Sequence, residues 1–335
     1  MAKQQSSYDN NSISMLKGPD KVRLRPAVIF GSDGLEGCEH SFFEILANSV
    51  DEAREGFGNK IDVKVRKDFS IVVEDCGRGI PLDWNEKEQR FNWELVFCEM
   101  YAGGKYDNET GNVYEYSLGL NGLGACATQF SSEYMNVVSY TKDCKYSISF
   151  KKGFPVTDLV KEDPVKRKTG TVIEWKPDIE VFTDISMPFE YFDEVIKKQA
   201  VANAGLTLTL DYECADGTHK NSEYLYKNGI VDYVNELISV DGNYMLSKDE
   251  EPDGEAETET DDTEEETEET EETGENTESE ENSEYETDGE SRTYALTKPA
   301  YFKTECRGRD RNDMNDYKLK IEMGFCFSNL INKIE

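Results

Sequence analysis

The sequence predicts an α/β fold, because helical and strand patterns alternate along a chain of 335 residues. An amphipathic pattern with a clear apolar flank predicts a helix from about Glu39 to Phe57, which Gly56 and Gly58 end. Two β-branched runs follow, at Ile61–Val65 and Ser70–Glu74, and the turn between them predicts a hairpin. The length also allows a second domain, so we expect the chain to divide.

The remaining elements follow from similar patterns, in chain order. Residues 1–20 read as an extended polar arm, and the apolar run Ala27–Phe30 as a short strand. Residues 102–124 form a long glycine-containing loop, which is typical of functional loops. Further strands are expected at about 135–141, 145–150, 171–175, 207–212 and 317–327, a turn at 215–217, and helices at about 92–101, 189–204 and 230–237.

The net charge is concentrated in one segment. Of the formal charge of −33, 24 carboxylates lie between Asp249 and Glu290, where there is no Lys or Arg. Without them the charge is −9, so the composition gives no global electrostatic case for DNA binding. This Glu/Thr-rich tract, residues 249–291, cannot bury apolar surface, and we expect it to be disordered.

Cysteine usage and hydropathy exclude several classes of protein. The eight cysteines are scattered without a CxxC pair, which indicates neither a zinc site nor a disulfide framework. Reduced thiols fit a cytoplasmic location best. Residues 1–12 lack the apolar core of a signal peptide, and no apolar run approaches a membrane span.

Three polar side chains form a stripe on the first predicted helix. Glu44, Asn48 and Glu52 stack one turn apart, and the helix has no Lys or Arg at the spacings that would pair with them. The stripe is either a solvated face or a cation site with a general base beside it. An amide oxygen and carboxylates are hard ligands that suit Mg²⁺.

Two glycine-containing stretches lie downstream. The first, Glu74-Asp75-Cys-Gly77-Arg78-Gly79-Ile80-Pro81, follows a predicted strand, and alone it could be only a turn. The second, Ser117–Gly124, is called the glycine stretch here and places three glycines before a helix start. Free backbone N–H groups at such a position cradle phosphate well. It is not a Walker loop, since no Gly-Lys-Ser/Thr follows.

In this order and spacing the three motifs resemble the N box, the Asp-x-Gly-x-Gly box and the glycine lid of the GHKL ATPases. Within that group the chain looks like the ATPase region of type IIA topoisomerases, the gyrase B and topoisomerase IV ParE subunits. The narrower match is carried by Tyr8-Asp9 with Ile13 and Leu16, by Val22-Arg23-x-Arg25-Pro26, by Tyr101-Ala-Gly-Gly-Lys105, and by Thr169-Gly170-Thr171 with Trp175-x-Pro177-Asp178.

The resemblance implies a two-layer α/β sandwich with a mixed, largely antiparallel sheet, followed by an incomplete α+β transducer domain. It places an N-terminal arm at residues 1–20, the ATP-binding domain at 21–228 and a partial transducer at 229–335, which the acidic tract 249–291 interrupts. The chain looks truncated within the transducer. The lysine with which the family's transducer touches the γ-phosphate would then lie beyond Glu335. The Toprim and DNA-cleavage regions would also lie beyond it.

The resemblance also implies roles for single residues. Glu44 would be the general base, supported by His40, and Asn48 would hold Mg²⁺. Asp75 would accept from the adenine amino group, joined by Thr171 through water, and Lys105 would lie near the terminal phosphate. The implied ATP pocket further includes Tyr8 of the arm, Glu52, Gly77, Arg78, Gly79, Ile80, Pro81, Val96, Gly119, Leu120, Asn121, Gly122, Leu123 and Gly124.

The function implied is Mg²⁺-dependent ATP hydrolysis by a cytoplasmic type II DNA topoisomerase, which closes as a nucleotide-dependent homodimer. The implied partners are DNA and a gyrase A or ParC-like subunit. The resemblance implies no membrane partner. The chain departs from the family in having Asn121 where the lid usually has His, Leu118 for a Gly, and Glu39 for a second His. An alternative is therefore a regulatory GHKL protein that senses ATP without productive turnover.

Overall fold

The computed structural model describes residues 14–102, 118, 122–166, 168–240, 243–244, 299–308 and 317–327. The chain divides into two compact units, Met1–Tyr233 with Thr304–Lys320, and Val234–Lys303 with Ile321–Glu335. Across the described ranges, no helix combines the length and the apolar character that a membrane crossing requires.

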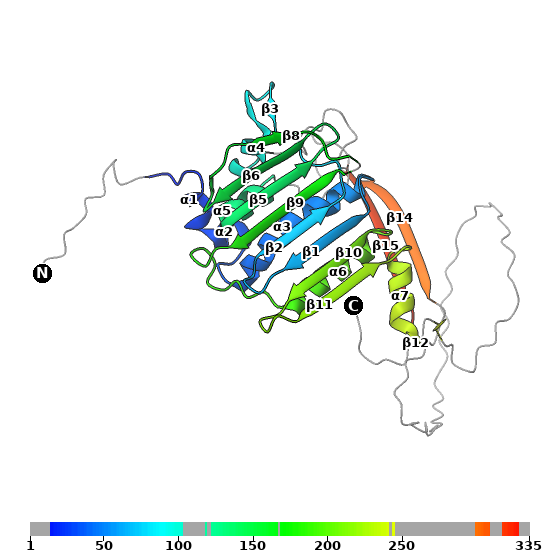
Figure 1. Ribbon diagram of the computed structural model, residues 1–335. Coiled ribbons are helices and arrows are strands. Elements are labelled where there is room, and N and C mark those ends of the chain that lie inside the picture. The colour runs from blue at the N-terminus through cyan, green and yellow to red at the C-terminus, as the bar shows by residue number, and fades with distance from the viewer. Residues whose placement is uncertain are drawn as a thin grey trace, which may run out of the picture. The chain divides into compact units, whose positions relative to one another are not determined.

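A mixed sheet forms the centre of the first unit (Figure 1). Within the described residues nine strands pair in the order β11-β10-β1-β2-β9-β5-β6-β7, and β8 also pairs with β6. The neighbours β1 and β10 run parallel, and the other pairs in this sheet run antiparallel. The strands are β1 (Lys60–Val65), β2 (Ile71–Asp75), β5 (Ser132–Tyr140), β6 (Lys145–Lys151), β7 (Phe154–Pro155), β8 (Val160–Glu162), β9 (Gly170–Pro177), β10 (Thr207–Glu213) and β11 (His219–Leu225).

Helices form the second layer on one face of this sheet (Figure 1). The long α3 contacts β1, β2 and β9, while α6 contacts β10 and β11. Next to α3 lies α5, which in turn contacts α4. The helices of this unit are α1 (Asp20–Arg23), α2 (Pro26–Phe30), α3 (Leu35–Arg54), α4 (Asn92–Cys98), α5 (Gly124–Phe130) and α6 (Phe189–Ala202), and a small ribbon joins β3 (Trp84–Asn85) to β4 (Arg90–Phe91). The predicted two-layer α/β fold with a mixed, largely antiparallel sheet is confirmed.

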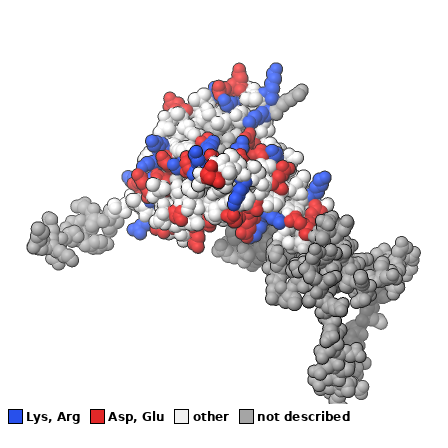
Figure 2. Space-filling view, turned by 60° about the horizontal axis from the view of Figure 1, so that its bottom comes forward, with Lys and Arg blue, Asp and Glu red and all other residues white. Residues whose placement is uncertain are grey.

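Charged side chains of both signs are intermixed on the face of the described residues that Figure 2 shows. On the sheet face opposite the helices, Arg66 pairs with Glu174 at 2.8 Å and Lys168 with Glu74 at 3.0 Å. Such exposed pairs contribute little stability each, typically about 0–1 kcal/mol. In these two pairs each basic side chain is matched by a carboxylate, so the two signs alternate on this part of the face.

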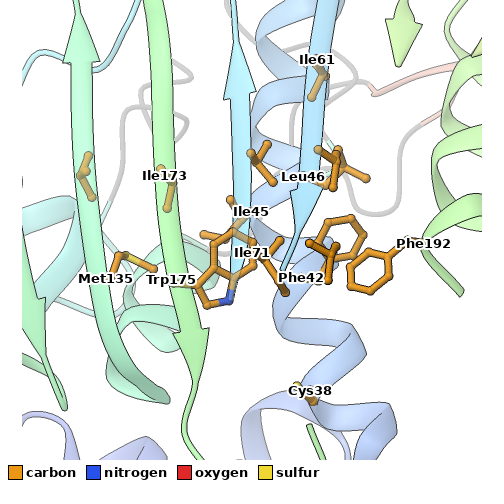
Figure 3. Close-up of a cluster of buried hydrophobic side chains, with 14 of the residues drawn as sticks. Cys38, Phe42, Ile45, Leu46, Ile61, Ile71, Met135, Ile173, Trp175 and Phe192 are labelled. Carbon is orange, nitrogen blue, oxygen red and sulfur yellow. The ribbon is translucent and has the colours of Figure 1, made fainter. Parts of the chain in front are cut away.

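The core lies between the two layers. It follows from the spacing of apolar residues, which repeat about every 3.6 residues in the helices and every two residues in the strands. Alternate residues of β1 are buried, namely Ile61, Val63 and Val65, whereas the central β2 buries three consecutive residues, Ile71, Val72 and Val73. Figure 3 shows Trp175 of β9 and Phe42 of α3 in the same cluster, and both are fully buried. Burying one such side chain stabilises the fold by about 1.5–3 kcal/mol, so α3 is fixed firmly on the sheet.

The expected strand at Ala27–Phe30 is wrong, because these residues belong to the helix α2. Pro26 occupies the first turn, where its fixed φ favours a helix and its missing N–H costs nothing. Gly31 ends the helix in the left-handed region at φ 80°, and its N–H donates to the carbonyl of Ala27. An apolar run of four residues carries no periodicity that separates strand from helix.

Two helix boundaries also differ from expectation. The helix expected from Glu39 begins at Leu35, one turn earlier, and ends at Arg54. The helix expected over 92–101 ends at Cys98, because Glu99 adopts extended backbone at φ −118° and ψ 131°. The earlier start of α3 matters for function, since it places His40 well inside a regular helix.

The described part of the second unit is small. The helix α7 (Ile230–Ile238) matches the expected helix at 230–237, and it runs from the first unit into the second. A ribbon of β12 (Ser239–Val240) with β13 (Asn243–Tyr244) follows in the second unit, and the pair β14 (Ala300–Gly308) with β15 (Tyr317–Phe325) is divided between the two units. Tyr301 donates its hydroxyl to the side-chain oxygen of Asn235 at 3.1 Å. The proposed domain boundaries, and the assignment of this unit to a transducer, stay predictions.

Candidate functional site

Glu44 lies on α3 and is held by His40, one turn before it on the same helix. The Nε2 atom of His40 lies 3.1 Å from Oε1 of Glu44, and its Nδ1 lies 3.2 Å from the carbonyl oxygen of Phe30. A carbonyl only accepts, so Nδ1 carries a proton, and a second proton on Nε2 would let both ring nitrogens donate. The hydrogen bond to Glu44 is the main cause of the raised pKa of His40. The ring is therefore fixed at both nitrogens and orients one oxygen of Glu44.

The other oxygen of Glu44 faces the first turn of α5. A Cβ atom added at Gly124 would lie 2.0 Å from Oε2 of Glu44 and 2.9 Å from its Cβ. At such distances the side chain of Glu44 would have to move, so glycine at this position lets the carboxylate of Glu44 reach the first turn of α5. The predicted base and the end of the glycine stretch are thereby brought together.

Asn48 lies one turn after Glu44 on the same helix. Its Nδ2 atom donates to the carbonyl oxygen of Glu44 at 3.0 Å. This bond uses the donor end of the carboxamide within the helix, which leaves the oxygen as the ligand atom. The side chain is partly buried beside Glu44 and so has the chemistry that the sequence predicts for a Mg²⁺ ligand.

Asp75 ends β2 and accepts hydrogen bonds from three different segments. Its Oδ2 accepts from the hydroxyl of Ser49 at 3.0 Å, and its Oδ1 accepts from the backbone N–H of Gly77 at 2.9 Å and of Thr171 at 3.1 Å. Burial raises the pKa of Asp75, and these donors oppose that shift. A partly buried carboxylate that still has free lone pairs can accept one more donor from a ligand.

Glu52 pairs with Arg78, which corrects the expectation of an unpaired acidic stripe. Oε1 of Glu52 accepts from Nε of Arg78 at 2.7 Å and from its backbone N–H at 3.0 Å, and Oε2 accepts from Nη2 at 2.9 Å. The guanidinium also lies 3.7 Å from the ring centre of Phe57. The positively charged partner of Glu52 is Arg78, which belongs to another motif. Residue spacing within α3 could therefore not reveal the pair. Glu52 thus holds the Asp75–Arg78 loop onto α3.

The rest of this loop is anchored on β5. The hydroxyl of Ser139 donates to the carbonyl oxygen of Ile80 at 2.8 Å. Gly79 has φ 77°, and a Cβ atom there would lie 2.4 Å from the carbonyl oxygen of Tyr140. Ile80 is partly buried and Pro81 is exposed, while Thr171 is buried on β9 beside Asp75. The loop is therefore tied to α3 on one side and to β5 on the other.

The predicted residues near the glycine stretch are only partly described. Val96 is partly buried on α4, and Gly122 and Leu123 directly precede α5. The backbone N–H of Tyr101 donates to the carbonyl oxygen of Gly122 at 3.1 Å. Five predicted site residues lie outside the described residues: Tyr8, Lys105, Gly119, Leu120 and Asn121. All the site assignments stay predictions.

Two residues of α3 to which the sequence alone assigned no role contact the motifs directly. Ser49 donates to Asp75, as above, and Asp51 accepts from the backbone N–H of Leu118 at 2.6 Å. Asp51 is only 1% exposed. The available signal was the spacing, since Asp51 lies seven residues after Glu44 and so returns to nearly the same face of the helix.

The described residues contain no group of three or more His, Cys, Asp or Glu side chains that could hold a metal by themselves. A shallow hollow of about 330 Å³ lies elsewhere, over β1, β10 and β11, where Lys64, Asp211 and Glu223 line it. None of the predicted site residues lines it. The contacts among the motifs, rather than this hollow, therefore define the candidate site.

Known proteins resemble the chain in both sequence and fold. It is 38% identical over 234 residues to DNA gyrase B of Staphylococcus aureus (strain Mu50 / ATCC 700699), a match that covers 70% of this chain and 36% of that protein. It is 35% identical over 232 residues to DNA gyrase B of Spiroplasma citri, covering 69% and 36%. The chain thus spans about a third of the length of these curated relatives. No protein-family profile matches it.

A solved structure matches about two thirds of the chain. The crystal structure of the 43K ATPase domain of Thermus thermophilus gyrase B in complex with an aminocoumarin aligns with a TM-score of 0.55 and 30% identity, covering 67% of this chain and 55% of that one. Sequence identity and shared fold agree with the three motifs and with the contacts that join them. The chain therefore carries a GHKL ATPase region of the gyrase B and ParE type.

Proposed function

We propose that this chain binds ATP with Mg²⁺ and hydrolyses it, as the ATPase region of a type II DNA topoisomerase. The observation that carries the proposal is the set of contacts made by one helix. Through Glu44, Ser49 and Glu52, α3 meets the first turn of α5, the carboxylate of Asp75 and the loop at Arg78. A base, a polar acceptor and the end of the glycine stretch therefore share one face.

The residues present fit the adenine end of ATP. Asp75 is a partly buried acceptor, and the adenine amino group is a donor that guanine lacks at the same position. Accepting that donor would favour the ionised carboxylate and offset the effect of burial. The N–H of Gly77 and of Thr171 already bind Asp75 from two sides, which keeps its oxygens in place before a ligand arrives.

The residues also fit the phosphate end. Bound at Asn48, Mg²⁺ would supply charge neutralisation at the phosphate oxygens, with most of its other ligands coming from water and phosphate. Glu44 would orient the attacking water and take its proton. His40 would keep the carboxylate of Glu44 aimed, because it holds one oxygen at 3.1 Å. Positioning and charge neutralisation are what phosphoryl transfer needs most.

The wider activity belongs to the same proposal. ATP-driven closure of a homodimer, passage of DNA strands and a gyrase A or ParC-like partner are functions of a whole enzyme, of which this chain matches 36% of the relatives' length. The alternative is a regulatory protein that senses ATP. Such a protein would bind ATP in the same pocket but would not hydrolyse it. Binding and turnover therefore need separate measurements.

Two substitutions test the site. Glu44→Gln keeps the shape and removes the base, so the affinity for a non-hydrolysable ATP analogue should stay within a few-fold while turnover falls about 10²–10⁴-fold. Asp75→Asn leaves a donor against the adenine amino group, a buried mismatch of about 1–3 kcal/mol that should lower the affinity. Calorimetry and steady-state ATPase assays decide between the outcomes. Turnover that survives in Glu44→Gln overturns the base, and undiminished binding in Asp75→Asn overturns the pocket.

A further inference from the structure

Asp51 is a buried carboxylate that the proposed mechanism does not use. It lies seven residues after Glu44 on α3 and is 1% exposed. At 3.6 residues per turn, a separation of seven residues brings a side chain back to nearly the same face. Burying an ionised carboxylate is costly unless donors compensate it. A residue kept at this position therefore needs a partner of matching chemistry.

One partner of Asp51 is a backbone group of the glycine stretch. The N–H of Leu118 donates to Oδ1 of Asp51 at 2.6 Å, across 67 positions of sequence. The side chain of Leu118 is partly buried and packs against the hydrophobic core. Leu118 is thus held at two points. Its backbone N–H binds Asp51 of α3, and its side chain packs against the core.

A second described residue of the stretch is fixed from another direction. The carbonyl oxygen of Gly122 accepts from the N–H of Tyr101, and Gly124 begins α5 against Glu44. Of these three contacts, the one at Asp51 alone uses a side-chain carboxylate as a hydrogen-bond acceptor. A charge-assisted hydrogen bond to a buried carboxylate is stronger than one between neutral groups.

We propose that Asp51 is a positioning residue for the ATPase site: its acceptor oxygen holds the backbone of Leu118 beside α3, the helix that carries Glu44 and Asn48. This inference rests on the proposed ATP site. Asp51 touches no reacting atom, and it acts through the backbone that it holds. The phosphate end of the nucleotide therefore depends on Asp51, while the adenine end, held at Asp75, does not.

The test compares two ligands in matched variants of this chain. Asp51→Ala removes the acceptor, Asp51→Asn keeps an oxygen at the same place, and Asp62→Ala removes a carboxylate on β1 away from the site. Affinity for a non-hydrolysable ATP analogue is measured by calorimetry, and affinity for adenosine, which has no phosphates, by ligand-observed NMR. Hydrogen exchange at the Leu118 amide reports directly on its hydrogen bond to Asp51.

The expected result is a loss of at least tenfold in analogue affinity for Asp51→Ala, with adenosine affinity within threefold and faster exchange at Leu118. Asp62→Ala should stay within threefold of the wild type for both ligands, and the analogue affinity of Asp51→Asn, which keeps a neutral acceptor, should lie between those of the wild type and Asp51→Ala. Equal losses for both ligands would mean a general structural role and overturn the inference, as would unchanged analogue binding or an Asp51→Asn variant as weak as Asp51→Ala. If Asp51→Ala does not fold, Asp51→Ser takes its place. A wild-type chain that binds no analogue refutes the proposed function itself.

Discussion

At the scale of single residues, Arg23 shows how a motif outside the pocket supports it. Its Nη2 lies 2.7 Å from Oδ2 of Asp178, and its Nη1 donates to the carbonyl oxygen of Phe130 at 3.1 Å. The side chains of Arg23 and Asp178 are only 14% and 4% exposed. The pair joins α1 to the segment after β9 and to the end of α5, the helix whose first turn faces Glu44.

Breaking this pair should be costly. Arg23→Met should lower the free energy of unfolding by about 3–5 kcal/mol, because it leaves the buried carboxylate of Asp178 without its cation. Urea titration measures the change. The double variant Arg23→Met with Asp178→Leu should recover much of the loss, since it removes the unpaired charge as well. A double variant no more stable than Arg23→Met would show that packing, rather than charge, dominates at this position.

The pH dependence of stability offers a second test at this scale. The chain has two histidines, His40 and His219, and a carboxylate raises the pKa of each, through Glu44 and Asp211 respectively. A raised folded-state pKa gives stability that is complete below the unfolded value of about 6.5 and is lost as the pH rises through the folded value. The free energy of unfolding should therefore fall as the pH increases above about 6.5.

Single variants separate the two contributions. His40→Gln should flatten part of this fall and leave the part that His219 contributes, while the double variant with His219→Gln should be nearly flat. Denaturant titrations at several pH values supply the measurement. A His40→Gln variant with the wild-type slope would show that the contact with Glu44 does not change the proton affinity of the ring.

At the scale of elements, α3 and α5 meet where glycine lets the carboxylate of Glu44 reach the first turn of α5. Gly124→Ala should displace the carboxylate of Glu44, because the added Cβ would lie 2.0 Å from Oε2. We expect turnover to fall at least about 10²-fold, as when a positioned base is lost. The thermal midpoint should change little, since Gly124 needs no positive φ and alanine favours helix.

The control is Gly34→Ala, at the start of α3. A Cβ atom there would meet Ser32 and Thr183 at ordinary contact distances of 3.5 and 3.7 Å. Steady-state ATPase assays and thermal melts on both variants complete the comparison. Comparable turnover in the two alanine variants would contradict the close approach of α5 to Glu44.

The elements also show what a sequence can and cannot predict. The long helix with Glu44 and the strand that ends at Asp75 were predictable, since each has a strong period or a clear β-branched run. The run Ala27–Phe30 is too short to show a helical or strand period. The neighbouring Pro26 and Gly31 decide its conformation. The pairing of Glu52 with Arg78 and the hydrogen bond of Leu118 to Asp51 join distant segments, so only the folded chain reveals them.

At the scale of the whole molecule, charge and function are separated along the chain. The acidic tract, residues 249–291, lies outside the described residues and after the described motif residues. Its composition gives no core, so replacing it with a short Gly/Ser linker should leave the affinity for the ATP analogue within about tenfold, or 1.4 kcal/mol. Calorimetry on the two chains measures this. A larger loss would show that the tract contributes to the pocket.

One consequence of the architecture concerns how the site can vary. Glu44, Asn48, Ser49, Asp51 and Glu52 all sit on one continuous helix, so their relative directions are set by helical pitch alone. Loops that approach this helix can lengthen or shorten without altering those directions. Inserting one residue between Glu44 and Glu52 would instead rotate the later contacts by about 100° relative to the earlier ones. Length variation should therefore be tolerated in the loops and excluded from these nine positions.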